Sequence, residues 1–195
     1  AARAGARVIG LDKRVRPGEP VQCAEFVPLS LGSEVEALGR FAVQPIAAMD
    51  TFTEGDGPRR DALPGWIIDR ARFDAGLVEA AREAGAECRF SAPVARVDAS
   101  GVTLSDGSRI EASVIVGADG PRSAVGRAIG SVNRVVSHTR QITVPLLEPH
   151  DATDIFLSAT MPGGYGWLFP KGAVANLGLG VDAPRVAHHA RGAAH

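Results

Sequence analysis

A carboxylate stands among small residues where an apolar stretch ends in the second half of the chain. Val114 to Val116 is a β-branched run of the kind found in strands buried on both faces. It ends at Gly117, Asp119 and Gly120, and a helix can begin at Pro121, where a missing N–H is tolerated. Such a turn lets the backbone approach a nucleotide, and its carboxylate can accept hydrogen bonds from sugar hydroxyls. An ordinary strand-to-helix turn has the same pattern.

A second carboxylate, Asp12, follows an apolar stretch near the start of the chain. We expect a strand over Arg7 to Leu11. In a dinucleotide-binding βαβ unit, an acidic residue at the end of the second strand binds the adenosine ribose hydroxyls, and Asp12 has that position. The alternative is a surface charge at the end of a strand. Lys13 comes next and can face either a phosphate or the solvent.

Three aromatic residues recur at every second position near the end of the chain. In a strand, Tyr165, Trp167 and Phe169 point to one face of the sheet. They can form an aromatic stripe in the core, or they can form the wall of an apolar tunnel for an extended hydrocarbon chain. Cys23 lies in a proline-containing loop, where a lone cysteine is more often a small buried apolar residue than a reactive one.

Three motifs resemble those of the geranylgeranyl reductase family. Its members are FAD-dependent oxidoreductases related to aromatic hydroxylases. GADGPRSAVGR at Gly117 to Arg127 is similar to the second flavin-contacting motif of these flavoproteins. PVQCAE at Pro20 to Glu25 and YGWLFP at Tyr165 to Pro170 narrow the match to the reductases. In that family the aromatic motif matched by YGWLFP is followed at a fixed distance by Gly-x-Gly, which here is Gly178 and Gly180.

The resemblance implies roles for particular residues. It implies FAD as the cofactor, bound by Asp12, Lys13, Arg70, Gly117, Asp119 and Gly120. A surface arginine in the first helical turn is the alternative for Arg70. The resemblance places the substrate along Tyr165, Trp167, Phe169, Gly178 and Gly180. Its catalytic candidates are Cys23, at the border of the isoalloxazine and the substrate channel, and Tyr165, as a proton donor.

The activity that the resemblance implies is the reduction of carbon–carbon double bonds in a prenyl group. The group would belong to a lipid, a quinone tail or a chlorophyll side chain, and the electrons would come from a nicotinamide or a ferredoxin. A flavin monooxygenase or halogenase is the alternative among enzymes. Halogenases have a similar motif with tryptophan first and isoleucine before proline, and Tyr165 and Phe169 stand there in this chain. A non-catalytic remnant or lipid-binding module is the alternative from another class.

Composition limits the partners and the cellular compartment that we expect for the protein. A net charge of −1 gives no support for a nucleic-acid partner. No apolar run approaches the roughly 20 residues of a membrane span, and the two cysteines, Cys23 and Cys88, indicate a reducing compartment. We therefore expect a cytoplasmic protein, with peripheral contact to the membrane as a further option. His188, His189 and His195 have no acidic or cysteine partner nearby, so no metal site is expected.

We expect an α/β fold in which a parallel FAD-binding sheet is joined to an antiparallel, strand-rich substrate domain. The FAD-binding domain is expected at 1–40 and 66–130, the substrate domain at 41–65 and 131–182, and a disordered tail at 183–195. Helical spacing of apolar residues predicts a helix that begins after Asp69 and ends at Gly85.

The glycine-rich first turn of a dinucleotide-binding unit does not occur upstream of Asp12, and the family's later flavin motif is absent as well. This chain is therefore expected to be a fragment of a longer enzyme, inactive by itself.

Overall fold

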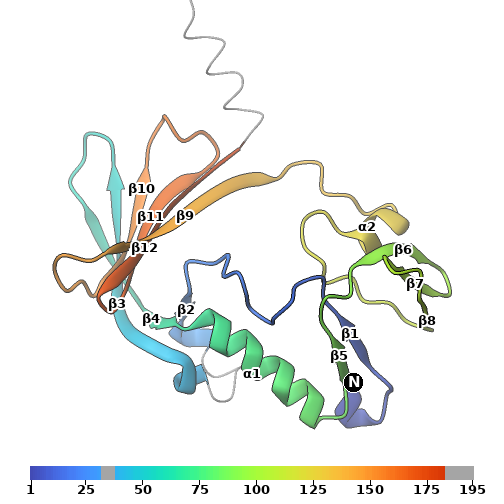
Figure 1. Ribbon diagram of the computed structural model, residues 1–195. Coiled ribbons are helices and arrows are strands. Elements are labelled where there is room, and N and C mark those ends of the chain that lie inside the picture. Colours follow the sequence, from blue (N-terminus) through green and yellow to red (C-terminus); the bar gives the residue numbers. More distant parts are fainter. Residues whose placement is uncertain (32–37, 183–195) are drawn as a thin grey trace, which may run out of the picture. The chain divides into compact units, whose positions relative to one another are not determined.

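The computed structural model describes residues 1–31 and 38–182 in two compact units (Figure 1). The first unit comprises Ala1–Val21 with Asp74–Arg134, and the second comprises Gln22–Phe73 with Val135–His195. The sequence from Ser33 to Leu38 could form one or two helical turns, and all of these residues except Leu38 lie outside the described ones. The expected tail at 183–195, with its three histidines, lies outside them completely.

A short parallel strand pair forms one part of the first unit. β1 (Ile9–Leu11) pairs in parallel with β5 (Glu87–Arg89), with Gly10 opposite Cys88. The 3₁₀ turn η1 (Ala2–Ala4) precedes β1 and ends at Gly5, whose φ of 85° suits glycine. The strand predicted at Arg7 to Leu11 is thus present in shortened form.

The helix α1 (Arg70–Glu83) begins and ends where the sequence indicates. Asp69 accepts a hydrogen bond from the N–H of Arg72 at 3.0 Å, as an N-cap residue does. Gly85 ends the helical segment with a φ of 92°. Among the described residues, no helix has the length and apolar character needed to cross a bilayer.

A three-stranded meander contributes the small core of the first unit. Its strands are β6 (Val94–Asp98), β7 (Gly101–Leu104) and β8 (Arg109–Glu111), paired in that order. Ala92, Val102 and Leu104 are buried in this core, and Ile115 packs against them. Arg109 closes the meander with a two-pronged ion pair to Asp98, at 2.8 and 3.0 Å.

The strand predicted at Val114 to Val116 is wrong. These residues belong to no strand among the described residues, and Val114 and Val116 are 77% and 82% exposed. Only Ile115 contacts the core. A strand buried on both faces needs neighbours that pair with it and layers that cover it, and within the described residues this run has only one covered face. The helix α2 (Ala124–Ala128) follows, capped by the Ser123 side chain.

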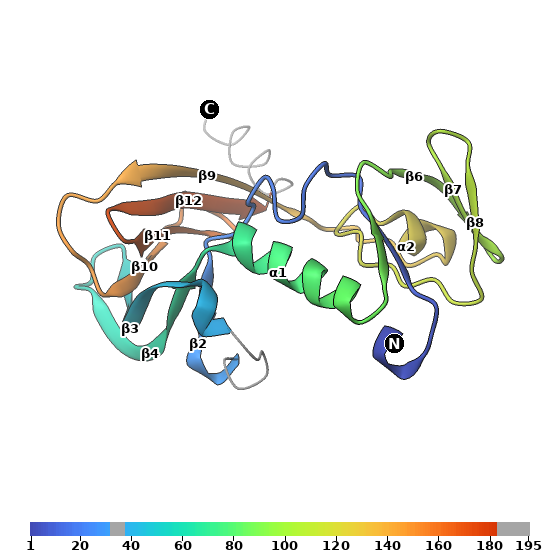
Figure 2. The same ribbon diagram turned by 60° about the horizontal axis from the view of Figure 1, so that its bottom comes forward.

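The second unit is built on one seven-stranded sheet. Its order is β2-β4-β3-β10-β11-β12-β9, and every neighbouring pair is antiparallel except β3 and β10. Figures 1 and 2 show β10, β11, β12 and β9 side by side. The strands are β2 (Phe26–Pro28), β3 (Ala42–Thr53), β4 (Arg59–Ile68), β9 (Ser137–Pro145), β10 (Ala152–Leu157), β11 (Tyr165–Lys171) and β12 (Val174–Asp182). Two 3₁₀ turns, η2 (Leu29–Leu31) and η3 (Leu38–Phe41), precede β3.

The two units divide the chain at other residues than those of the expected domains, whose boundaries stay a prediction. Residues 22–31, 38–40 and 66–73 lie in the second unit, where β2 pairs with β4 and β4 with β3, and residues 131–134 lie in the first. The mixed α/β class is confirmed. The assignment of FAD to one domain and substrate to the other stays a prediction.

Candidate functional site

The aromatic strand β11 and the Gly-x-Gly of β12 fit each other directly. Trp167 lies opposite Gly178 in the antiparallel ladder. A Cβ atom at Gly178 would overlap the six-membered ring of Trp167, so the indole lies over a position that only glycine leaves open. Gly180 is less constrained by the ring, because a Cβ atom there would be 3.8 Å from it. The close approach of the indole explains why residue 178 is a glycine.

Gln141 of β9 joins Trp167 to the cysteine loop. The Trp167 Nε1–H donates to Gln141 Oε1 at 3.0 Å, and Gln141 Nε2–H donates to the carbonyl of Cys23 at 3.1 Å. Gln141 lies opposite Gly178, so Gln141, Gly178 and Trp167 form one row across three strands. The sequence did not indicate Gln141, because its partners are 26 and 118 residues away.

The three aromatic residues lie on one face of β11, as their spacing predicts. Tyr165 is 46% exposed, and its ring centre is 5.8 Å from that of Trp167. Phe169 meets Phe26 edge-on at 6.1 Å. One end of the row is therefore packed while the other is open. Its use as the wall of a substrate tunnel stays a prediction.

A buried carboxylate, Glu25, lies next to the cysteine in the chain. Its side chain is 3% exposed and accepts hydrogen bonds from Lys171 Nζ at 2.7 and 2.8 Å and from Asn176 Nδ2 at 2.9 Å. The backbone N–H of Arg70, at the first turn of α1, donates to it at 2.9 Å. Buried charges need compensation of this kind, and the helix N-terminus adds a favourable dipole.

Cys23 is half-buried and is fixed from two sides. Its sulfur accepts a hydrogen bond from the N–H of Glu25 at 3.2 Å, and its carbonyl accepts the one from Gln141. Both cysteines are free thiols, and Cys88 lies in β5 of the first unit. The structure thus brings Cys23, Trp167 and Gly178 into one connected set, with Gln141, Glu25 and Lys171 as members that the sequence did not single out.

Asp12 lines a cavity in the first unit. The cavity measures about 320 Å³, a size in the range of small-molecule sites, and its lining includes Gly10, Asp12, Leu77 and Cys88. Asp12 follows directly after β1, at the carboxyl end of the parallel pair, where ligands bind in open α/β sheets. Its Oδ1 accepts the N–H of Arg14 at 2.9 Å. Lys13 is exposed and is not among the residues that line the cavity.

Asp119 caps the helix α2. Its carboxylate accepts a hydrogen bond from the Ser123 hydroxyl and from two N–H groups of α2, the nearer at 2.6 Å. The Ser123 hydrogen bond, helped by the helix N–H groups, holds the pKa of Asp119 below its usual value. Gly120 has a φ of 81°, and a Cβ atom at Gly117 would be 2.8 Å from Val125. Helix capping and packing therefore account for this turn, and a flavin contact stays a prediction.

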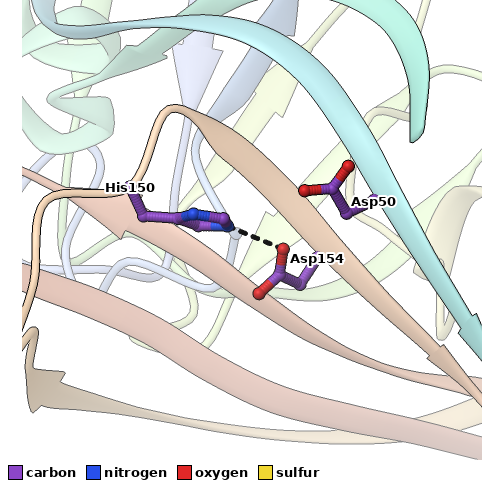
Figure 3. A group of neighbouring side chains, drawn as sticks. All are labelled: Asp50, His150 and Asp154. Atoms are coloured by element: carbon purple, nitrogen blue, oxygen red, sulfur yellow. Dashed lines mark hydrogen bonds and ion pairs between the residues drawn. The ribbon is translucent and has the colours of Figure 1, made fainter. Parts of the chain in front are cut away.

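A second charged group lies between β3 and β10 (Figure 3). Asp50 and Asp154 are opposite each other in the parallel ladder, and His150 Nε2 is 2.7 Å from Asp154 Oδ1. One potential ligand atom from each of the three lies within 4.8 Å of the others. Burial raises the pKa of Asp154, the hydrogen bond with His150 opposes that shift, and the charge of Asp50 adds to it. Arg60 pairs with Asp50 at 3.1 Å, so each carboxylate already has a basic neighbour.

Comparisons with known proteins identify the family. Residues 135–193 match the model of the geranylgeranyl reductase catalytic domain. An uncharacterised Methanosarcina barkeri protein encoded 5′ of nifH2 is 35% identical over 72% of this chain and 87% of its own length. The digeranylgeranylglycerophospholipid reductase of Methanosphaerula palustris is 31% identical over 95% of this chain. The chain belongs to the geranylgeranyl reductase family.

Solved structures agree with this fold. A geranylgeranyl bacteriochlorophyll reductase-like protein of Thermoplasma acidophilum superposes with a TM-score of 0.82 at 24% identity, over 94% of this chain and 52% of that one. A halogenase, PltM, in complex with phloroglucinol and FAD, superposes with a TM-score of 0.69 at 15% identity, over 94% of this chain and 48% of its own. This chain spans 52% of the length of both the M. palustris reductase and the T. acidophilum protein.

The family model matches a defined part of the second unit. Within the described residues it covers β9 to β12, which contain Gln141, Trp167 and Gly178. The Cys23 loop precedes the matched range but is bonded to it through Gln141. Asp12, Gly117 and Asp119 lie in the other unit, outside the matched range. The roles expected for all these residues stay predictions.

Proposed function

We propose that this chain is part of an FAD-dependent reductase that saturates carbon–carbon double bonds in the prenyl chain of a lipid. The observation that carries the proposal is the row of Gln141, Gly178 and Trp167, which attaches the aromatic strand to the Cys23 loop within a matched catalytic domain. The two motifs that resemble the reductases in particular, PVQCAE and YGWLFP, are connected there through Gln141.

FAD fits the chemistry of the first unit. The Asp12 carboxylate at the rim of a cavity, after a parallel strand, can accept hydrogen bonds from ribose hydroxyls. Lys13, Gly117, Asp119 and Gly120 are the other proposed binding residues of this unit. Arg70, which lies in the second unit, is a further candidate from the resemblance. When bound and reduced, FAD supplies a hydride. A nicotinamide or a ferredoxin is the proposed source of its electrons.

The aromatic face of the second unit is proposed to bind the prenyl chain. Tyr165, Trp167 and Phe169 give a rigid apolar surface that orders a flexible hydrocarbon at little cost in side-chain entropy. Gly178 and Gly180 have no side chains that would project from this face beside the tryptophan. A fixed surface of this kind orients one alkene for reaction and keeps water from it.

Reduction of an alkene requires a hydride on one carbon and a proton on the other. Tyr165 is the proposed proton donor, because its half-exposed phenol stands at the open end of the aromatic row. Cys23 is proposed to border the reacting end of the prenyl chain, where its sulfur and carbonyl are both held in place. A prenylated lipid is the proposed substrate class, and contact with the membrane surface would give access to it.

The test is to express the protein as its host encodes it and to identify the products formed from a geranylgeranyl lipid by mass spectrometry. A gain of two hydrogen atoms per double bond supports the proposal. A gain of oxygen or halogen would instead assign the protein to the monooxygenases or halogenases. Bound flavin with no reaction on geranylgeranyl lipid, geranylgeranyl quinone or chlorophyll precursors would also contradict it.

A further inference from the structure

Two unfavourable features meet at Glu25. Its charged side chain is only 3% exposed, although removing a charged group from water costs free energy. Its backbone φ is 72°, in the left-handed region that residues other than glycine rarely adopt. Strain of this kind persists only where the surroundings over-determine the conformation. Glu25 is therefore held by its contacts rather than by its own preference.

The contacts to its carboxylate come from three separate elements. Lys171 of β11 reaches both carboxylate oxygens, Asn176 of β12 reaches one, and α1 supplies the N–H of Arg70. Asn176 is itself 3% exposed and is oriented by the Thr143 hydroxyl of β9 at 3.2 Å. A change at residue 25 would therefore disturb a connected and fully packed group.

The same contacts attach the cysteine loop to the aromatic face. Asn176 lies opposite both Phe169 and Thr143, so these three form a second row beside that of Gln141, Gly178 and Trp167. The first row binds the carbonyl of Cys23, while Asn176 in the second reaches the carbonyl of Ala24 and the carboxylate of Glu25.

The backbone of Glu25 contacts the thiol directly. Its N–H donates to the Cys23 sulfur at 3.2 Å, and the left-handed φ of 72° belongs to the N–Cα bond that follows this N–H. The carbonyl of Glu25 is fixed at the same time by the N–H of Ile68 at 2.9 Å. The carboxylate anchor, the strained turn and the hydrogen bond to sulfur form one continuous arrangement.

We propose that Glu25 is a positioning residue for Cys23: its buried ion pair with Lys171 holds the turn at 23–25 so that the thiol keeps one orientation beside the Trp167 row. The alkene-reduction part of this inference rests on the proposed function, whereas the placement of the thiol depends on the second unit alone.

The first experiment measures the alkylation rate of each cysteine by iodoacetamide, with Cys88 as the reference in the same sample. In Glu25→Gln, the loss of a charge-assisted hydrogen bond should free the turn and raise the rate at Cys23 about tenfold relative to Cys88. Glu79→Gln is the matched control, because it removes an exposed glutamate that pairs with Arg82 on α1. An unchanged rate at Cys23 in Glu25→Gln would overturn the proposal.

A double variant separates positioning from simple charge compensation. Glu25→Gln leaves the Lys171 charge unpaired, which by itself destabilises the protein. Glu25→Met with Lys171→Met removes both charges, and such apolar replacements restore stability in other buried pairs. We expect this variant to unfold at a denaturant concentration close to that of the original chain, yet to keep the fast alkylation of Cys23. A return to the original rate would show that the carboxylate only balances the lysine.

Turnover of a geranylgeranyl lipid gives the second readout. Glu25→Gln should lower kcat about tenfold with little change in KM, because a misplaced thiol affects the reacting end rather than the binding of the chain. If the original protein does not reduce prenyl chains but the alkylation result holds, the proposed function fails and the positioning role stands. If it reduces them and Glu25→Gln matches it in alkylation and kcat, the positioning role fails.

Discussion

At the scale of single residues, the site depends on contacts between side chains and main chain that are far apart in the sequence. Trp167 occupies the space over Gly178, Gln141 satisfies the indole N–H, and Glu25 turns its own N–H toward Cys23. Each member restricts another, so a small change at one of them should be felt at the rest. The absence of a Cβ atom at residue 178 is the simplest example.

Gly178→Ala tests this dependence. The added methyl would overlap the indole, so either Trp167 moves and loses its hydrogen bond to Gln141 or the strands separate. We expect a loss of about 1–3 kcal/mol in the free energy of unfolding, as for other overpacked sites, together with a shift in tryptophan fluorescence. Gly57→Ala is the control, since nothing lies within 4 Å of a Cβ atom there. Unchanged stability and fluorescence in Gly178→Ala would show that the indole does not need this space.

At the scale of elements, short and local signals determined what could be predicted. Asp69 before α1 and the alternation of Tyr165, Trp167 and Phe169 act through neighbouring residues, and the structure has the expected helix and strand there. The run at Val114 to Val116 was mispredicted, because β-branched composition indicates an extended chain but not whether another strand pairs with it.

Asp119, which was expected to contact the flavin, caps the helix α2. Because hydrogen bonds to Ser123 and the helix N–H groups lower the pKa of Asp119 in the folded state, the folded state binds its proton less readily than an unfolded chain does. The ionised Asp119 therefore stabilises the folded state, and this stabilisation is fully present above the usual aspartate pKa of about 4. It is lost as the pH falls through the lower, folded-state pKa.

Asp119→Ala should therefore weaken α2 at neutral pH and have little effect at low pH. Hydrogen exchange at the amides of α2, corrected for the intrinsic rate, would show lost protection in the variant at pH 7 and a difference between the two proteins that shrinks as the pH is lowered. Asp61→Asn serves as the control, because Asp61 is a surface partner of Arg59 in β4. Equal protection of α2 at pH 7 in the original chain and Asp119→Ala would remove the capping role.

At the scale of the whole molecule, the candidate functions divide between two units. Asp12, a carboxylate that suits a ribose, lines a cavity in the first unit, and residues that suit a hydrocarbon chain follow the face of β11 in the second. The sequence indicated both groups, since the end of a strand and an aromatic alternation can be read locally. It did not indicate Gln141, Lys171 or Asn176, because these act across a sheet whose register is set only when the strands have paired.

This division leads to a prediction that separates the two units. Asp12→Ala removes a carboxylate proposed to hold the ribose, so FAD affinity should fall by about one to two decades, equivalent to a charge-assisted hydrogen bond of about 1.5–3 kcal/mol. The alkylation rate of Cys23 should not change, because the contacts that fix the thiol all lie in the second unit. Flavin titration by fluorescence quenching, in the protein as its host encodes it, measures the first effect. Unchanged FAD affinity would exclude Asp12 from the site, and a parallel change at Cys23 would show that the two units do not act independently.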